Sequence, residues 1–197
     1  MVRFQDSQTK INLMRAFAGE SQARNRYTFA AEQAEKQNLH VLREVFTFTA
    51  NQEKEHGEIF YQLLQELDGQ VIGIDGTYPV NTSNEISHML QAACENEKEE
   101  AETVYPAFSK IAKEEGFQQA AYAFEMIAKI EKTHEQRFGH FLGLVKEHAL
   151  FVSDTQVTWV CLNCGHVSYG TKAPEICPVC KHPQGFFIAS SMAPFTE

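Results

Sequence analysis

The chain has 197 residues, which is enough for one domain of ordinary size and a small second domain. Its 43% hydrophobic and 22% charged residues are typical of a globular protein, and no apolar run approaches the roughly 20 residues that span a bilayer. The formal net charge of −9 argues against nucleic acid as a partner. Acids on buried stripes weaken this point, because a bound cation would neutralise their negative charge. Met1 to Lys10 is polar and lacks the apolar stretch of a signal peptide, so we expect a cytoplasmic protein.

Two long helices are predicted in the first third of the chain. The first runs from about Thr9 to Gln37 and the second from about His40 to Leu67. Because the connection between them is short, the two helices should lie antiparallel. At about 1.5 Å per residue, Glu20 on the first helix and Glu53 on the second then lie at nearly the same height.

Residues 68–82 are rich in glycine and turn formers and are too long for a tight turn, so we expect a crossover along the bundle. A third helix follows the capping box Thr82-Ser83-Asn84-Glu85 and runs to Glu115, with Pro106 predicted to kink or locally open it. The fourth helix runs from Phe117 to about His148. Four helices with one long crossover have the ferritin-like topology.

Each predicted helix carries an apolar stripe at spacings of three and four, and ionisable residues interrupt every stripe. The second and fourth helices each place a Glu-x-x-His pair there, which puts a carboxylate and an imidazole one turn apart on the same face. Both halves of the chain repeat the order Glu, Tyr, Glu-x-x-His, so a duplicated helical hairpin is the simplest interpretation. The ionisable residues in core phase are Glu20, Glu53, His56, Glu97, Glu100, Glu131 and His134.

Five carboxylates in a bundle interior would repel one another, and each would lose several kcal/mol of hydration. One alternative is a polar layer of protonated glutamates and hydrogen-bonded histidines, but so many ionisable residues at one level favour a dinuclear cation site. One Glu from each of two helices, plus Glu-x-x-His from each of the other two, is the ligand set of di-iron and di-manganese bundles. Oxygen donors with only two imidazoles suit iron or manganese better than zinc.

The composition changes after the fourth helix. Residues 150–157 carry no helical pattern and are interpreted as a linker between a bundle domain at 1–149 and a small domain at 158–197. Two C-x-x-C pairs with a twelve-residue spacer predict a tetrahedral metal site in the small domain, because thiolates at this spacing converge on one ion. Its ligands are Cys161, Cys164, Cys177 and Cys180. So small a segment needs a metal to fold, but the ligands alone do not separate iron from a structural zinc.

Several segments together resemble the rubrerythrin family, and the resemblance covers nearly the whole chain. They are GESQARNRY (19–27), EKEH (53–56), ENEKEEAETVYP (95–106) and EKTHE (131–135), followed by C-x-x-C-G and C-P-x-C. The resemblance implies a mainly α protein, in which a ferritin-like di-iron four-helix bundle precedes a small rubredoxin-like domain. It also favours iron in the four-cysteine site, where Trp159, Gly165 and Tyr169 resemble rubredoxin.

The resemblance implies a role for each bundle residue in holding two irons. Glu53 and Glu131 would bridge the ions, while Glu20 would be terminal on one and Glu97 on the other. His134 would be a fixed ligand of the second iron.

The first iron would have a variable ligand. By resemblance it exchanges His56 for Glu100 on oxidation, and the harder ferric ion should prefer the carboxylate. Tyr27 and Tyr105 would hydrogen-bond the ligating carboxylates, although plain core tyrosines are an equally good interpretation.

The activity that the resemblance implies is that of a non-haem di-iron peroxidase in oxidative stress protection. A diferrous centre would reduce hydrogen peroxide to water and become diferric and oxo-bridged. The rubredoxin-type Fe(Cys)4 site would return electrons from an external donor such as rubredoxin or an NAD(P)H-dependent reductase. The chain has no Gly-rich dinucleotide fingerprint, so we do not expect it to bind the nicotinamide itself.

Family members dimerise, so a homodimer or higher homo-oligomer is expected, with neither nucleic acid nor a membrane as partner. Two other functions are considered. A ferritin-like ferroxidase or iron-storage protein would need no electron-delivery domain, and a pure electron carrier would need no dinuclear ligand set.

Overall fold

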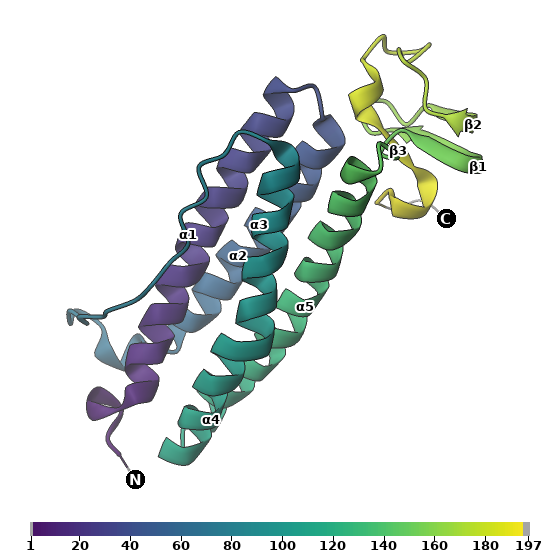
Figure 1. Ribbon diagram of the computed structural model, residues 1–197. Helices are drawn as coiled ribbons and strands as arrows, with labels where there is room; N and C mark the ends of the chain where they lie inside the picture. Colours follow the sequence, from purple (N-terminus) through teal and green to yellow (C-terminus); the bar gives the residue numbers. More distant parts are fainter. Residues whose placement is uncertain (1, 195–197) are drawn as a thin grey trace.

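The computed structural model describes residues 2–194, which form a long helical bundle with a small β-domain at one end (Figure 1). The bundle consists of α1 (Gln8–Lys36), α2 (His40–Gln62), α3 (Ile86–Glu99), α4 (Tyr105–Glu115) and α5 (Gln118–Lys146). A π-helical segment, Glu100–Val104, joins α3 and α4 into one continuous rod, so the described chain has the predicted four-helix architecture. Among the described residues, no helix is both long and apolar enough to cross a bilayer.

The rods pair as two hairpins, as the internal repeat predicts: α1 packs on α2, and the α3–α4 rod packs on α5. Ser7 caps α1, because its hydroxyl accepts a hydrogen bond from the Lys10 backbone N–H at 3.1 Å. Asn38 in the left-handed conformation (φ 58°) turns the chain into α2. The second helix ends at Gln62, earlier than predicted, and a 3-10 turn over Gln65–Leu67 follows it.

The crossover runs along α1 back to the end of the bundle where α3 begins (Figure 1). The predicted capping box at its end does not form. Glu85 is the N-cap of α3 and makes no side-chain capping bond. Instead the Ser83 hydroxyl accepts from the Glu85 backbone N–H at 3.1 Å, a local turn that competes with the cap.

Pro106 opens the third rod locally, as predicted. It lies in the first turn of α4, directly after the π segment. Without an N–H, proline cannot bond the carbonyl four residues earlier, and the widened π turn accommodates the lost bond. The rod ends at Gly116, whose φ of 93° favours glycine.

Two apolar clusters fill the bundle, one on each side of the level that carries the ionisable residues. The first cluster surrounds Phe46 and Phe138 and extends toward the small domain. The second surrounds Phe60 and Phe124 toward the other end. The layer of ionisable residues therefore lies between two packed clusters of apolar side chains.

The small domain is an antiparallel sheet in the order β2-β1-β3, built from β1 (Val152–Cys161), β2 (Val167–Lys172) and β3 (Phe187–Ala189). The linker prediction for 150–157 needs correction, since β1 already begins at Val152, opposite Lys172 on β2. Sheet pairing there satisfies backbone groups that a free connection would leave to solvent. The last three residues of the predicted small domain, 195–197, lie outside the described residues.

The small domain docks on the α1–α2 end of its own bundle. Val160 and Ile188 from the sheet belong to the first apolar cluster. Gly185 lies so close to the turn that a Cβ there would be 1.7 Å from the Asn38 carbonyl oxygen, so only glycine fits. The His40 ring stacks on Phe186 with 3.8 Å between the ring centroids.

Candidate metal centres

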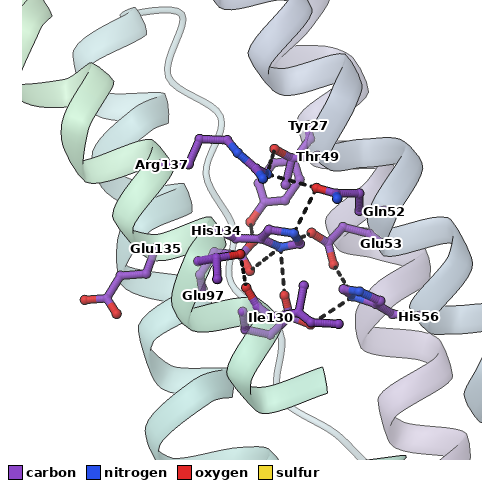
Figure 2. Close-up of polar contacts among 12 residues, drawn as sticks. Tyr27, Thr49, Gln52, Glu53, His56, Glu97, Ile130, His134, Glu135 and Arg137 are labelled. Carbon is purple, nitrogen blue, oxygen red and sulfur yellow. Dashed lines mark hydrogen bonds and ion pairs between the residues drawn. The ribbon is translucent and has the colours of Figure 1, made fainter. Parts of the chain in front are cut away.

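The bundle brings six of the seven predicted residues together in its centre. Figure 2 shows four of them, Glu53, His56, Glu97 and His134. The six residues form two donor sets that share Glu53 and Glu131: one adds Glu20 and His56, and the other adds Glu97 and His134. Within each set the candidate ligand atoms all lie within 4.8 Å of one another. All six side chains are buried: His56 is 4% exposed, and the others are 0% exposed.

The donor atoms around His134 converge on one point. Its Nδ1 lies 2.8 Å from Glu131 Oε2, 2.9 Å from Glu53 Oε1 and 3.3 Å from Glu97 Oε2 (Figure 2). A single imidazole nitrogen carries at most one hydrogen, so it cannot donate to three carboxylates. This convergence fits ligands around a shared cation.

The second set is arranged in the same way around His56. Its Nδ1 lies 2.9 Å from Glu131 Oε1, 3.3 Å from Glu53 Oε2 and 4.0 Å from Glu20 Oε2. Glu20 Oε2, Glu53 Oε1 and both Glu131 oxygens are buried without a hydrogen bond of acceptable geometry, although imidazole nitrogens lie near them. Buried carboxylate oxygens rarely go unbonded, and divalent ions would satisfy them.

The pKa shifts of the cluster indicate that its buried carboxylates lack enough positive charge around them. Burial, followed by the charges of Glu131 and Glu53, raises the pKa of Glu20 well above its ordinary value. The pKa of Glu97 is also raised, by burial first and then by Glu53. Burial alone would lower the pKa of His134, but its contacts with Glu131, Glu53 and Glu97 raise it to about 11. Two divalent cations would remove the need for these protons.

Two tyrosine hydroxyls hold the outer carboxylates, each across the interface between the hairpins. Tyr27 donates from α1 to Glu97 Oε1 on α3, and Tyr105 donates from α4 to Glu20 Oε1 on α1. Both tyrosines are buried, and burial followed by the neighbouring carboxylates raises their pKa well above 10. They therefore stay protonated and act as donors.

A further network around His134 was not predicted from the sequence. The Nε2 of His134 lies 3.1 Å from Gln52 Oε1, which also accepts a 2.9 Å bond from Arg137 Nη1 (Figure 2). Arg137 donates in addition to Thr49 Oγ1 at 3.0 Å. Because Gln52 offers an acceptor to an Nε2 hydrogen, Nδ1 is the ring nitrogen that a cation among the carboxylates would bind. The one sequence signal that could have indicated this network is the position of Arg137, one helical turn after His134.

Glu100, the seventh predicted residue, belongs to neither donor set. It lies in the π segment and is partly buried. Burial, followed by the charges of Glu97 and Glu131, raises its pKa well above the ordinary value. Its carboxylate lines a cavity of about 550 Å³ beside α1. The structure thus places this carboxylate next to the dinuclear set and at the wall of the cavity.

The four cysteines of the small domain form a second donor set. The Sγ atoms of Cys161 and Cys180 are 3.7 Å apart, as are those of Cys164 and Cys177. A tetrahedron with metal–sulfur bonds of about 2.3 Å has edges of about 3.8 Å, so the spacing fits one metal ion and not disulfides. A hydrogen bond from the His182 backbone lowers the pKa of Cys180 to about 5, whereas burial raises the pKa of Cys161 to about 12. A bound metal ion would hold all four cysteines as thiolates.

Comparison with known proteins identifies the family of both domains. The family model described as Rubrerythrin matches residues 12–142, and the model described as Rubrerythrin, rubredoxin-like domain matches residues 159–188. The chain belongs to the rubrerythrin family. It is 42% identical to Rubrerythrin of Porphyromonas gingivalis, covering 92% of this chain and 89% of that protein. It is 40% identical to Rubrerythrin-1 of Clostridium acetobutylicum, covering 95% of this chain and 96% of that protein.

Solved structures show the same architecture. Nigerythrin in a mixed-valence state superposes with a TM-score of 0.63 at 29% identity, over 96% of this chain and 91% of that one. The bacterioferritin of Desulfovibrio desulfuricans has a TM-score of 0.65 at 22% identity, which shows the shared fold. The predicted fold class is therefore confirmed. The family and the two donor sets agree on the cofactors, a di-iron centre in the bundle and a rubredoxin-type iron in the small domain.

Proposed function

We propose that this iron-binding oxidoreductase is a peroxidase that reduces hydrogen peroxide to two waters, with electrons relayed through the Fe(Cys)4 site. The observation that carries the proposal is the position of Glu100: a surplus carboxylate lies beside a complete dinuclear donor set and lines a cavity. A storage site or a simple electron carrier would not need both a spare ligand and an adjoining cavity. The reaction consumes one peroxide, two electrons and two protons.

When bound, the two irons supply the two electrons and the Lewis acidity that cleavage of the O–O bond requires. The protein's part is to hold the donors in place. Glu53 and Glu131 contact both donor sets and so would bridge the ions. Tyr27 and Tyr105 fix the terminal carboxylates, and the Gln52 acceptor orients His134.

We assign proton supply to Glu100, and ligand exchange to the pair Glu100 and His56. Glu100 lines the cavity, and its carboxyl group is the candidate to supply a proton there, where a product oxygen needs one. The structure has His56 within the donor set and Glu100 outside it. We propose that His56 is the ligand in the reduced enzyme and that Glu100 replaces it on oxidation, because a ferric ion prefers the harder ligand.

Electron delivery is proposed to come from a second copy of the chain. Within one chain the small domain docks beside His40, while Glu53 lies thirteen residues further along α2, which is about 20 Å at 1.5 Å per residue. The small domain of a partner in a homodimer or larger oligomer could lie closer. The primary donor would be rubredoxin or an NAD(P)H-dependent reductase, and the site of action the cytoplasm.

One experiment separates the candidate functions. The protein is reduced anaerobically, peroxide or oxygen is added, and the visible band of the Fe(Cys)4 site is followed in a stopped-flow instrument. A peroxidase reoxidises much faster with peroxide than with oxygen and turns over. Faster oxidation by oxygen with accumulation of iron would instead identify a ferroxidase or storage protein. Reoxidation without turnover would identify an electron carrier.

A pair of substitutions tests the site itself. Glu53→Ala or Glu131→Ala should abolish peroxide turnover while leaving the Fe(Cys)4 spectrum unchanged, because the two sites lie in separate regions of the fold. Glu55→Ala is the matched control, since Glu55 is an exposed carboxylate on the same helix. Surviving turnover in the Glu53 and Glu131 variants would contradict the site assignment.

A further inference from the structure

The cavity beside the π segment is built from three parts of the chain. Its walls are α1, the crossover residues 75–79, and the π segment with the start of α4. Glu100 and Tyr105 both line it, and the Tyr105 hydroxyl donates to Glu20. The cavity therefore adjoins Glu100, the surplus carboxylate, and Tyr105, which contacts a residue of the donor set.

A glycine leaves the inner end of this cavity open. A Cβ at position 19 would lie 3.7 Å from Tyr78 Cε1 and 3.9 Å from Glu100 Oε1. The phenol ring and the carboxylate thus approach the same bare stretch of α1, next to Glu20. A methyl group would make ordinary contacts there, whereas any larger side chain would fill the space between Tyr78 and Glu100.

The crossover holds Tyr78 in this position through contacts with one residue of α1. The Arg15 guanidinium pairs with the Asp75 carboxylate and donates to the Asp75 carbonyl oxygen at 3.0 Å. The Tyr78 hydroxyl donates to the Arg15 carbonyl oxygen at 3.1 Å. Gly76 allows the segment to fold tightly, because a Cβ there would lie 3.1 Å from the Tyr78 ring.

We propose that this cavity is the route by which a small, neutral hydroperoxide reaches Glu100, and that Gly19 and Tyr78 set the size of the substrate. With about 550 Å³, the cavity itself could hold an organic hydroperoxide, so any selection for hydrogen peroxide is assigned to the space between Tyr78 and Glu100 beside Gly19. The identity of the substrate rests on the proposed peroxidase function. The route to the irons does not, and it can be tested in a protein without peroxidase activity.

The route is tested by the binding of azide, a small ligand of ferric iron, to the oxidised, fully iron-loaded protein. Gly19→Val should lower the azide association rate by about tenfold or more, because the branched side chain fills the passage. Tyr78→Ala should raise that rate. Matched controls are Gly143→Val, a helical glycine with no atom within 4 Å of a Cβ, and Tyr122→Ala, an exposed tyrosine on α5. An unchanged rate in Gly19→Val with full iron content would overturn the proposal.

The size-selecting role is tested with two substrates. Tyr78→Ala should raise the ratio of kcat/KM for cumene hydroperoxide to that for hydrogen peroxide by about tenfold. An unchanged ratio would remove Tyr78 from substrate selection. If Gly19→Val loses iron, Tyr78→Trp replaces it, and this variant should slow azide binding and lower the ratio. A protein without peroxidase activity in which these variants still alter azide binding would refute the proposed function and leave the route standing.

Discussion

The two iron sites of this chain lie in regions that depend on their metal in opposite ways. The bundle site lies between two apolar clusters that pack without any of its ligands. In the small domain the buried core is Trp159, Cys161, Ala173, Cys177, Phe187 and Ala189, so two metal ligands are part of the core itself. The comparison teaches that iron supports the fold of the small domain, whereas the bundle supports a ligand set that is costly to bury.

Loss of one cysteine should have the largest effect. Cys161→Ser should unfold the small domain, because structural metal sites of this kind contribute about 10–16 kcal/mol, more than a small domain's whole stability. Trp159 is the only tryptophan of the chain and is 1% exposed, so its fluorescence reports on this domain directly. We expect its emission to shift to longer wavelength while the circular dichroism at 222 nm keeps most of its helical signal. Cys94→Ser, outside the site, should change neither signal.

The connection between the two regions should be the next most sensitive point. Gly185→Ala would place a methyl group against the Asn38 carbonyl, and relieving this clash should cost about 3 kcal/mol by moving the small domain off the bundle. Thermal unfolding followed by Trp159 fluorescence should then precede the loss of helix by a wider margin than in the parent protein. Gly170→Ala is the control, since its Cβ would make ordinary contacts at 3.8 Å. Equal effects of the two substitutions would show that the docking contact is unimportant.

The cost of burying ligands can be measured in the metal-free bundle. Burial raises the pKa of Glu20, so folding is penalised once the pH exceeds the unfolded pKa of about 4.3, and the penalty grows until the folded pKa is passed. Metal-free Glu20→Gln should therefore be more stable than the parent by about 1–3 kcal/mol at pH 8, with a gain that vanishes near pH 4. Urea unfolding followed by circular dichroism measures the difference. A loss of stability at pH 8 would show that the ionised carboxylate is well accommodated.

The smallest effect is expected at the far end of the bundle, where Glu115 caps α1. Its carboxylate accepts the backbone N–H groups of Gln8 at 2.9 Å and Thr9 at 2.8 Å. Burial opposes ionisation, but the bonds from Thr9 and Gln8 outweigh it and lower the pKa of Glu115. Its contribution is therefore present above the unfolded pKa of about 4.3 and is lost as the pH falls through the lower folded pKa.

Glu115→Gln should accordingly destabilise the bundle by about 1 kcal/mol at pH 7 and by less at pH 3, measured by urea unfolding. Glu114→Gln, an exposed carboxylate one position earlier, is the control. Trp159 fluorescence in the native state should not change. An effect independent of pH would show that the charge of Glu115 does not matter.

Local patterns along the chain were sufficient for the helices, the two Glu-x-x-His pairs and the four-cysteine site. Helical periodicity places Glu53 and His56 on one face whatever surrounds them, and the short spacing of each C-x-x-C pair constrains its own thiolates. The capping box was predicted wrongly, and the predicted linker overlaps the start of β1. In both, a local signal was overridden, by the Ser83 turn in one case and by pairing of β1 with β2 in the other.

Contacts between distant segments could not be derived in this way. Gln52 binds His134 only because α2 and α5 pack in one register, and Gly185 meets Asn38 only because the small domain docks on its own bundle. The displacement of Glu100 from the donor set accompanies a π turn whose extra residue no periodic pattern reveals. By itself, therefore, the sequence determined which residues could bind iron, because ligand spacing is local. Tertiary structure alone decided which of them converge, which carboxylate faces the cavity and what lies over it, because these depend on how separate helices and the crossover pack.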